Sequence, residues 1–191
     1  MMEATFNLNK RYTFADYLEW ADNVRREIID GMVKMMTAPS SRHQRISTLL
    51  TVRLFNAIEE NKGKCEVYSA PFDVRLPKNG EKDDHLIHTV VQPDICVVCD
   101  SSKIDDKGCL GAPDMVVEIQ SLSTSKIDMN DKFHLYEMAG VREYWVVIPS
   151  EGVVVFILQP DGKYDDGTKY DSSTIPVHIF NGIEIELDVK K

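Results

Sequence analysis

The spacing of apolar residues predicts a short helix, a hairpin and a long helix in the first third of the chain. Residues 13–16 have the spacing of a capping box, and the apolar residues that follow share one helical face. Residues 27–35 predict two strands around an Asp-Gly turn. A longer helix is predicted to start at Ser40 or Ser41 and to end near Lys62. Its apolar stripe has a helical period and consists of Ile46, Leu49, Leu50, Leu54, Ala57 and Ile58.

Apolar runs in the rest of the chain predict strands and one more helix. Residues 78–88 are polar with a charge cluster and predict an exposed, mobile loop. Apolar and acidic residues alternate over 183–187, which is typical of a strand with one face in water. The other predicted strands span 65–70, 72–76, the two apolar runs that hold Asp94 and Glu118, 143–149 and 152–158.

A strand–helix–strand unit is predicted around the second of these runs. Polar residues follow the strand that holds Glu118, and Ser125 and Asp128 have capping-box spacing. The helix should stop at Gly140, a favoured residue just past a helix end. The next strand, over 143–148, should then lie parallel to the first through a right-handed crossover. The fold class is therefore α/β: a mixed β-sheet flanked by helices, with a β-rich C-terminal third.

Two carboxylates fall where strands should be buried. Asp94 opens one apolar run, and Glu118 lies between Val117 and Ile119 in the other. Burying a carboxylate is costly unless a cation or several donors meet it. Two of them on neighbouring strands predict a divalent-metal site, although Asp94 after Pro93 is also compatible with the end of a turn.

A Pro-Asp pair, a gap, and a Glu followed by a polar residue outline the core of the PD-(D/E)xK nucleases. Further matches extend this outline over most of the chain. They are Glu27 to Gly31, His43, Pro71 to Val74, Pro93-Asp94, Ala112 to Ile119, Ser121, Asp128, Lys132, Tyr136 and Ala139 to Trp145. With these residues the chain resembles the Uma-two family, a group of restriction-endonuclease-like proteins widespread in bacteria.

The resemblance implies a restriction-endonuclease-like domain with Mg²⁺ or Mn²⁺ as cofactor. Asp94, Glu118 and the backbone carbonyl of Ile119 would bind the ion. Gln120 shares a strand face with Glu118 and stands where the nuclease core usually has a lysine. The resemblance implies that Lys132, on the following helix, supplies the missing charge. The alternative for Lys132 is an ordinary helix pair with the aspartate four residues earlier.

Four more residues fit the family pattern as second candidates. Glu27 opens the hairpin beside two arginines, and His43 lies in the first turn of the long helix. Asp73 alternates with apolar neighbours, and Tyr136 lies one helical turn beyond Lys132. Glu27, His43 and Asp73 would serve as a ligand, a phosphate contact or a proton donor. Their alternatives are an arginine pair, a boundary histidine and a solvated acid, and that of Tyr136 is core packing.

Charge argues against tight nucleic-acid binding. The chain carries a formal net charge of −9, whereas nucleic-acid-binding proteins usually present a basic face. Metal-dependent nucleases, however, gather acids at the site, where ions reverse the local sign. The arginines at 42, 45 and 53 share the long helix, and Arg25 and Arg26 precede a strand. They are compatible with either a nucleic-acid contact or a solvated face.

The 191 residues are expected to form one domain, 1–191, since no linker composition divides them. No apolar run has the length of a membrane span, and the polar N-terminus does not fit a signal peptide. A cytoplasmic protein without membrane contact is therefore expected. A homodimer is kept as one expectation for its assembly.

The cysteines are expected to be buried free thiols. Cys96 and Cys99 have metal-binding spacing, but residues three apart in a strand point to opposite faces and cannot share one ion. Cys65 and Cys109 are isolated in the sequence.

These observations predict a metal-dependent nuclease that hydrolyses phosphodiester bonds, with DNA as the expected partner. The alternative is a lapsed nuclease fold that serves as a binding or scaffold module. Gln120 and the acidic composition favour that alternative.

Overall fold

A computed structural model gives the architecture. It describes residues 7, 9–20, 22, 24–120, 126–149, 151–171, 174–180 and 183–187, and of 126–128 only the backbone. The predicted cap at Ser125 and the side chain of Asp128 lie outside these residues. No helix in the described ranges combines the length and the apolar character needed to cross a membrane.

One six-stranded sheet, here the central sheet, has the strand order β12–β11–β10–β9–β6–β3. Strands β9 and β10 are parallel and joined by α3, as the strand–helix–strand pattern predicts. The other neighbours are antiparallel. The elements are β3 (Glu66–Ser69), β6 (Ile95–Val98), β9 (Met115–Ile119), α3 (Lys126–Ala139), β10 (Glu143–Ile148), β11 (Gly152–Ile157) and β12 (Thr168–Tyr170).

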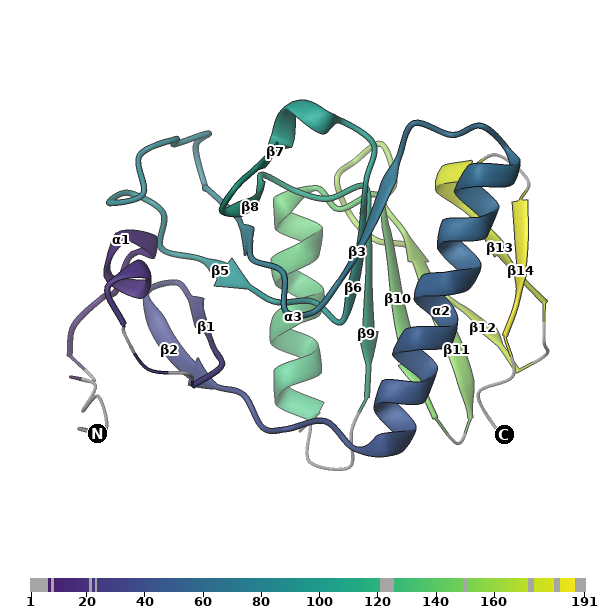
Figure 1. Cartoon of the computed structure of the whole chain (residues 1–191), viewed down its shortest axis with the longest axis horizontal. Coiled ribbons are helices and arrows are strands. Elements are labelled where there is room, and N and C mark those ends of the chain that lie inside the picture. The colour runs from purple at the N-terminus through teal and green to yellow at the C-terminus, as the bar shows by residue number, and fades with distance from the viewer. Residues whose placement is uncertain are drawn as a thin grey trace.

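Helices α2 (Ser41–Glu60) and α3 lie on opposite sides of the central sheet (Figure 1). Alternate residues of one strand therefore enter two different cores. In β9, Val117 packs with Leu50 and Leu54 of α2, whereas Val116 packs with Tyr136 of α3. By the same alternation, Glu118 belongs to the α3 face.

A second six-stranded sheet, here the lateral sheet, has the order β2–β1–β5–β4–β8–β7. It shares the α3-side core with the central sheet through Val74, Leu76 and Val91. Its elements are β1 (Arg26–Ile29), β2 (Met32–Met35), β4 (Val74–Arg75), β5 (Val90–Val91), β7 (Ile104–Asp105) and β8 (Gly108–Leu110), with α1 (Phe14–Leu18) and η1 (Ser101–Lys103) beside them. The remaining elements, β13 (Thr174–Val177), η2 (His178–Phe180) and β14 (Ile183–Glu186), complete the α2-side core.

The α/β class, the flanking helices and the strand-rich C-terminal third are confirmed. Local patterns account for the agreement: Thr13 and Asp16 form the capping box, and Asp30 and Gly31 take positive φ in the hairpin turn. The lateral sheet was not anticipated. It is assembled from strands as short as Val90–Val91, and strands of two residues leave no periodic signal.

The prediction for the cysteines is half wrong. Cys96 and Cys99 do lie on opposite faces, since Cys96 packs in the α3-side core and Cys99 against the α2-side core. Cys96 and Cys109 are free and buried. Cys99, however, forms a disulfide with Cys65. Strand β3 pairs with β6 so that Glu66 lies opposite Val98, and the next pair in that register is 65 and 99.

Candidate active site

Glu118 lies near the C-terminal end of β9 and is 8% exposed. Its Oε1 accepts hydrogen bonds from Lys132 Nζ at 2.8 Å and from Tyr136 OH at 2.7 Å. Both donors come from α3, where residues four apart share one face. An ammonium and a hydroxyl therefore compensate the buried carboxylate on one of its two oxygens.

Asp94 immediately precedes β6 and faces Glu118 across two adjacent strands. Ile95 pairs with Val117, so the next pair in this antiparallel register is 94 and 118. Asp94 Oδ2 accepts from Ile119 N–H at 2.7 Å and lies 3.0 Å from His43 Nε2. The Ile119 carbonyl points to the same side of β9 as its N–H, toward Asp94, because both groups of one residue leave a strand on the same edge.

Glu27 brings a third carboxylate from the lateral sheet. It is 4% exposed, and its Oε1 accepts from Lys132 Nζ at 2.9 Å and from Gln92 N–H at 2.9 Å. The Lys132 ammonium thus bridges Glu27 and Glu118 and joins the two sheets.

The three carboxylates share one arrangement. In each, the donors described above meet a single oxygen, and the other oxygen has no hydrogen bond within the described part of the chain. A cavity of about 480 Å³ opens beside them. Its lining includes Arg25, Glu27, Lys34, Met35, Met36, His43, Gln44, Asp94, Glu118, Ile119, Met129 and Lys132.

Burial sets the protonation of these groups. Desolvation raises the pKa of Glu118 to about 7; Lys132 opposes the shift, and Asp94 and Glu27 add to it. Burial alone would lower the pKa of Lys132. The negative charges of Glu118 and Glu27 outweigh burial and raise this pKa, so the ammonium stays charged. The bond to Asp94 raises the pKa of His43. At neutral pH, Glu118 is therefore poised between its two protonation states.

Most residues predicted from the sequence meet here. Lys132 points to Glu118 and Glu27, as expected of a site residue. Tyr136 packs in the core, as its structural interpretation expected, and its hydroxyl also reaches Glu118, but it is not among the residues that line the cavity. Glu27 was expected to pair with an arginine if it was structural; the structure pairs it with Lys132.

Two predicted residues lie apart from the cavity. Gln120 follows β9, bonds through its N–H to the Val147 carbonyl and does not line the cavity. Asp73 accepts from Tyr17 OH and Gln92 Nε2 and does not line it either. Asp73 is half-buried rather than fully solvated, and burial raises its pKa.

The sequence did not single out Gln92 or Arg25 for this site. Gln92 is 6% exposed and contacts Glu27, Arg25 and Asp73 with its backbone and side chain. The signal that the sequence offered for Gln92 was its position two residues before Asp94. An amide that is buried at such a position needs several hydrogen-bond partners. Arg25 lies two residues before Glu27, so both side chains are expected on the same face of the strand. That spacing was the sequence signal for Arg25.

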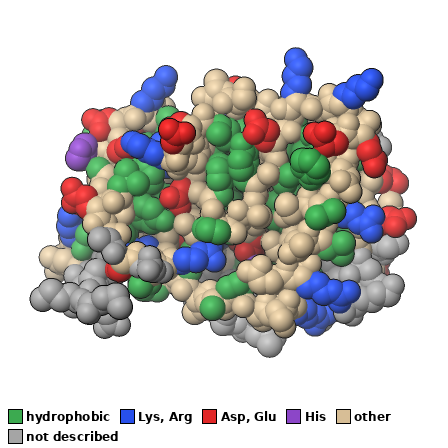
Figure 2. All heavy atoms as spheres, in the orientation of Figure 1, with side chains coloured by type: hydrophobic (Ala, Val, Ile, Leu, Met, Phe, Trp, Pro, Cys, Tyr) green, Lys and Arg blue, Asp and Glu red, His purple; other side chains and the backbone are tan. Residues whose placement is uncertain are grey.

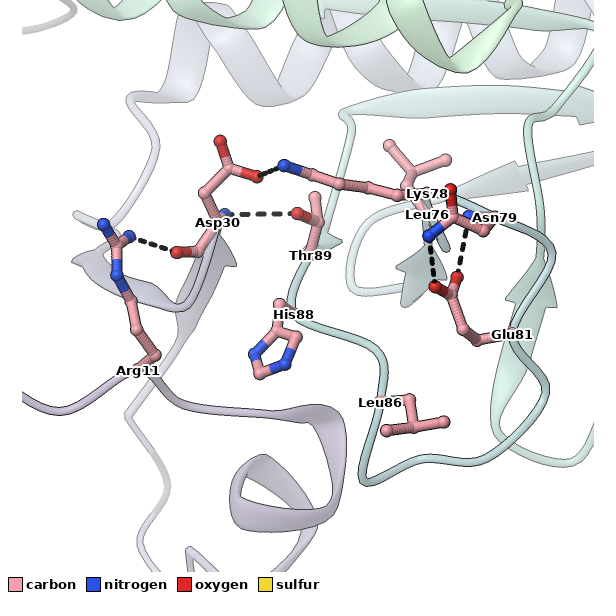
Figure 3. A pocket seen from close by; sticks show the side chains of 9 residues that line it. All are labelled: Arg11, Asp30, Leu76, Lys78, Asn79, Glu81, Leu86, His88 and Thr89. Carbon is pink, nitrogen blue, oxygen red and sulfur yellow. Dashed lines mark hydrogen bonds and ion pairs between the residues drawn. The ribbon is translucent and has the colours of Figure 1, made fainter.

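A second hollow of about 460 Å³ lies beside the turn between β1 and β2 and is lined mainly by residues between Leu76 and Thr89 (Figure 3). Lys78 Nζ lies 2.9 Å from Asp30 Oδ1 and forms an ion pair with it, and Arg11 bonds to the Asp30 backbone carbonyl. Glu81 accepts from Asn79. This hollow lacks the opposed carboxylates of the first cavity.

Comparison with known proteins agrees with this architecture. A crystal structure described as "a putative nuclease belonging to DUF820" from Anabaena variabilis is similar to the chain with a TM-score of 0.68 at 20% sequence identity. The match covers 94% of this chain and 96% of the other. At this identity the similarity shows the fold. No curated protein matches the chain.

The model of the Uma2 family, described as "Putative restriction endonuclease", matches residues 14–189. This range holds both sheets and every residue of the cavity named above. The chain, as its sequence indicated, belongs to the Uma2 family.

Proposed function

We propose that the protein is a nuclease that hydrolyses phosphodiester bonds, most readily in DNA, with Mg²⁺ or Mn²⁺. One observation carries the proposal. Asp94 and Glu118 face each other on adjacent strands beside a cavity, with the Lys132 ammonium held against Glu118. A binding module has no need for an opposed, partly compensated carboxylate pair of this kind.

The donor set fits a hard divalent ion. The described residues include no cluster of three or more His, Cys, Asp or Glu side chains arranged as a metal site. Mg²⁺, however, uses one or two carboxylates and completes its shell with carbonyl, water and phosphate oxygens. Asp94 and Glu118 would hold the ion through the carboxylate oxygens that the described residues leave open, and the Ile119 carbonyl would be its backbone ligand. When bound, it lowers the pKa of water and offsets charge on the phosphate.

Lys132 has the position and the free donor needed to assist hydrolysis. An ammonium has three N–H donors, and Glu118 and Glu27 accept two of them. The third remains for a phosphate oxygen or the attacking water. Because two carboxylates fix the ammonium, little reorganisation is needed when charge develops on the phosphate. This charge replaces the one that Gln120 lacks.

His43 and Tyr136 position the carboxylates. His43 Nε2 and Ile119 N–H both engage Asp94 Oδ2, and Tyr136 OH engages Glu118 Oε1. Hydrogen bonds of this kind fix the orientation of ligating carboxylates.

The net charge of −9 gives the protein no general attraction for DNA. On the face shown in Figure 2, acidic and basic side chains are interspersed among apolar ones. We infer that binding relies on the cations of the cavity and on the ion. The single domain over 1–191, the cytoplasmic location and the homodimer remain parts of this proposal.

Cleavage of DNA and RNA by the purified protein, with Mg²⁺, Mn²⁺ or chelator, tests the function. Metal-dependent cleavage is expected from wild type and is expected to be lost in Glu118→Gln. Glu151→Gln is the matched control, since Glu151 is an exposed glutamate paired with Lys169. A wild type that is inert with every metal and nucleic acid, yet folded, would favour the lapsed scaffold instead.

A further inference from the structure

Arg25 lines the same cavity as the three carboxylates but has no direct hydrogen bond to any of them. It precedes β1 by one residue, and its carbonyl accepts from Met36 N–H, which extends the β1–β2 ladder. Residues two apart in a strand share a face, so Arg25 and Glu27 point to the same side. They are separated by about 7 Å along the strand.

The charge of Arg25 is available to a ligand. Among the described residues, two lysines also line the cavity, and both are bonded to carboxylates: Lys34 to Asp131, and Lys132 to Glu118 and Glu27. Arg25 Nε instead donates to the neutral Gln92 Oε1 at 3.1 Å. Within the described ranges, this is the guanidinium's hydrogen bond, and no carboxylate lies within ion-pair distance of it. Four of its five N–H donors remain.

Gln92 is itself fixed. Its Nε2 donates to Asp73 Oδ1 at 2.8 Å and to Tyr17 OH at 3.1 Å, which leaves Oε1 for Arg25. Its backbone N–H donates to Glu27. A carboxylate at this position would orient the guanidinium but neutralise it. An amide orients it and leaves the positive charge in place.

We propose that Arg25 binds a backbone phosphate of the nucleic acid, next to the phosphate that meets Asp94 and Glu118, and that Gln92 is its positioning residue. This inference rests on the proposed function. Guanidinium is suited to the role because its planar fork can bond two phosphate oxygens at once. The distance from Glu27 places this contact beside the carboxylates rather than among them.

Binding measured without divalent metal separates this contact from catalysis. Fluorescence anisotropy with a short fluorescein-labelled DNA strand, single or annealed, should show about tenfold or more weaker binding for Arg25→Met than for wild type. The slope of log affinity against log salt should fall by about one. Arg25→Lys should lie between them. Arg142→Met, which removes an exposed arginine paired with Asp114 outside the cavity, should bind as wild type.

Substrates with one uncharged methylphosphonate linkage locate the phosphate. One linkage position should weaken binding by wild type and have no further effect on Arg25→Met. Gln92→Met should weaken binding in the wild-type background but add nothing to Arg25→Met, because it acts through Arg25. Melting curves of each variant verify the fold.

The outcomes are distinct. If wild type cleaves and Arg25→Met binds with wild-type affinity and salt slope, the contact is wrong and the nuclease proposal stands. If no wild-type binding or cleavage is found with any nucleic acid, both proposals are overturned.

Discussion

Two buried glutamates on neighbouring strands of the central sheet differ in what surrounds them. Glu118 on β9 and Glu143 on β10 are 8% and 0% exposed. Burial is the main cause that raises the pKa of each. They lie toward opposite ends of the paired strands. They also lie on opposite faces of the sheet: Glu143 is on the same face as Trp145 in the α2-side core, and Glu118 is on the same face as Val116 in the α3-side core.

The surroundings of Glu143 are complete. Its Oε1 accepts from Trp145 Nε1 at 2.7 Å and its Oε2 from Ile179 N–H at 2.8 Å. Both donors are neutral and both oxygens are bonded. The carboxylate ties η2 and the C-terminal hairpin to β10, so its role is to hold the fold together.

The surroundings of Glu118 are incomplete by comparison. One oxygen meets an ammonium and a hydroxyl, and the other has no described partner beside the cavity. Burial and a raised pKa therefore do not identify a reactive carboxylate, because both glutamates have them. An open oxygen and a charged donor distinguish Glu118.

The largest expected effect comes from exchanging each glutamate for glutamine. Glu118→Gln should lower the cleavage rate by at least about 10²-fold, because it removes the charge that would hold the ion. Glu143→Gln should instead cost about 1–3 kcal/mol of stability, since an NH₂ group would then face a bonded donor. Urea unfolding measures the stability of each variant, and cleavage per folded molecule measures its rate. Equal loss of rate in folded Glu143→Gln would break the comparison.

Lys132→Met should affect both properties. The ammonium compensates two buried carboxylates, so its loss should destabilise the fold by about 3 kcal/mol near neutral pH and slow cleavage by about 10²-fold. The stability loss should shrink at low pH, where Glu118 takes up a proton. Urea unfolding at several pH values checks this. A loss below about 0.5 kcal/mol at neutral pH would mean that Lys132 behaves as an exposed pair.

The proton on Glu118 links stability to pH. Its pKa rises from 4.5 to about 7 on folding, so between these values the folded protein holds a proton that the unfolded chain has released. The stability from this group is fully present below pH 4.5 and is lost as pH rises through about 7. The change is on the order of 3 kcal/mol. Glu118→Gln should have a correspondingly flatter stability profile, measured by urea unfolding; an unchanged profile would contradict the assignment.

Divalent metal should counteract the loss of stability that occurs as the pH rises through about 7. An ion binds ionised Glu118, so the rise in melting temperature with Mg²⁺ or Mn²⁺ should grow as pH increases through about 7. At a hundred times the dissociation constant it corresponds to about 2.7 kcal/mol. Glu143→Gln should retain the shift and Glu118→Gln should lose it. A shift of equal size in both variants would place the ion elsewhere.

The part of the site that the sequence predicts rests on local patterns. Glu118 could be recognised because Val117 and Ile119 mark a buried strand. For Lys132 the local pattern also allowed an ordinary helix pair, and the family resemblance indicated the site role. The parallel pairing of β9 and β10 follows from the connection itself.

The remainder depends on contacts between distant segments. Glu27 reaches Lys132 because the lateral sheet packs on the α3 side, and that sheet includes strands of two residues. The disulfide between Cys65 and Cys99 follows from the register of β3 with β6. The burial of Gln92 has a different cause, since its four hydrogen-bond partners come from three separate segments. Periodicity reports which face a residue occupies, but not what another segment places against it.

The smallest expected effect is that of Tyr136→Phe. The ring would still pack in the α3-side core, so the change removes the 2.7 Å hydrogen bond to Glu118 and little else. A bond to a charged acceptor contributes about 1.5–3 kcal/mol, and the loss should be at the lower end because Lys132 still compensates the carboxylate. Without the hydroxyl the ionised form is less favoured, so the pKa of Glu118 should rise further. The acid limb of the rate profile should then move to higher pH, while the rate at high pH falls little. A lower plateau with an unmoved acid limb would show that Tyr136 contacts the substrate rather than tuning Glu118.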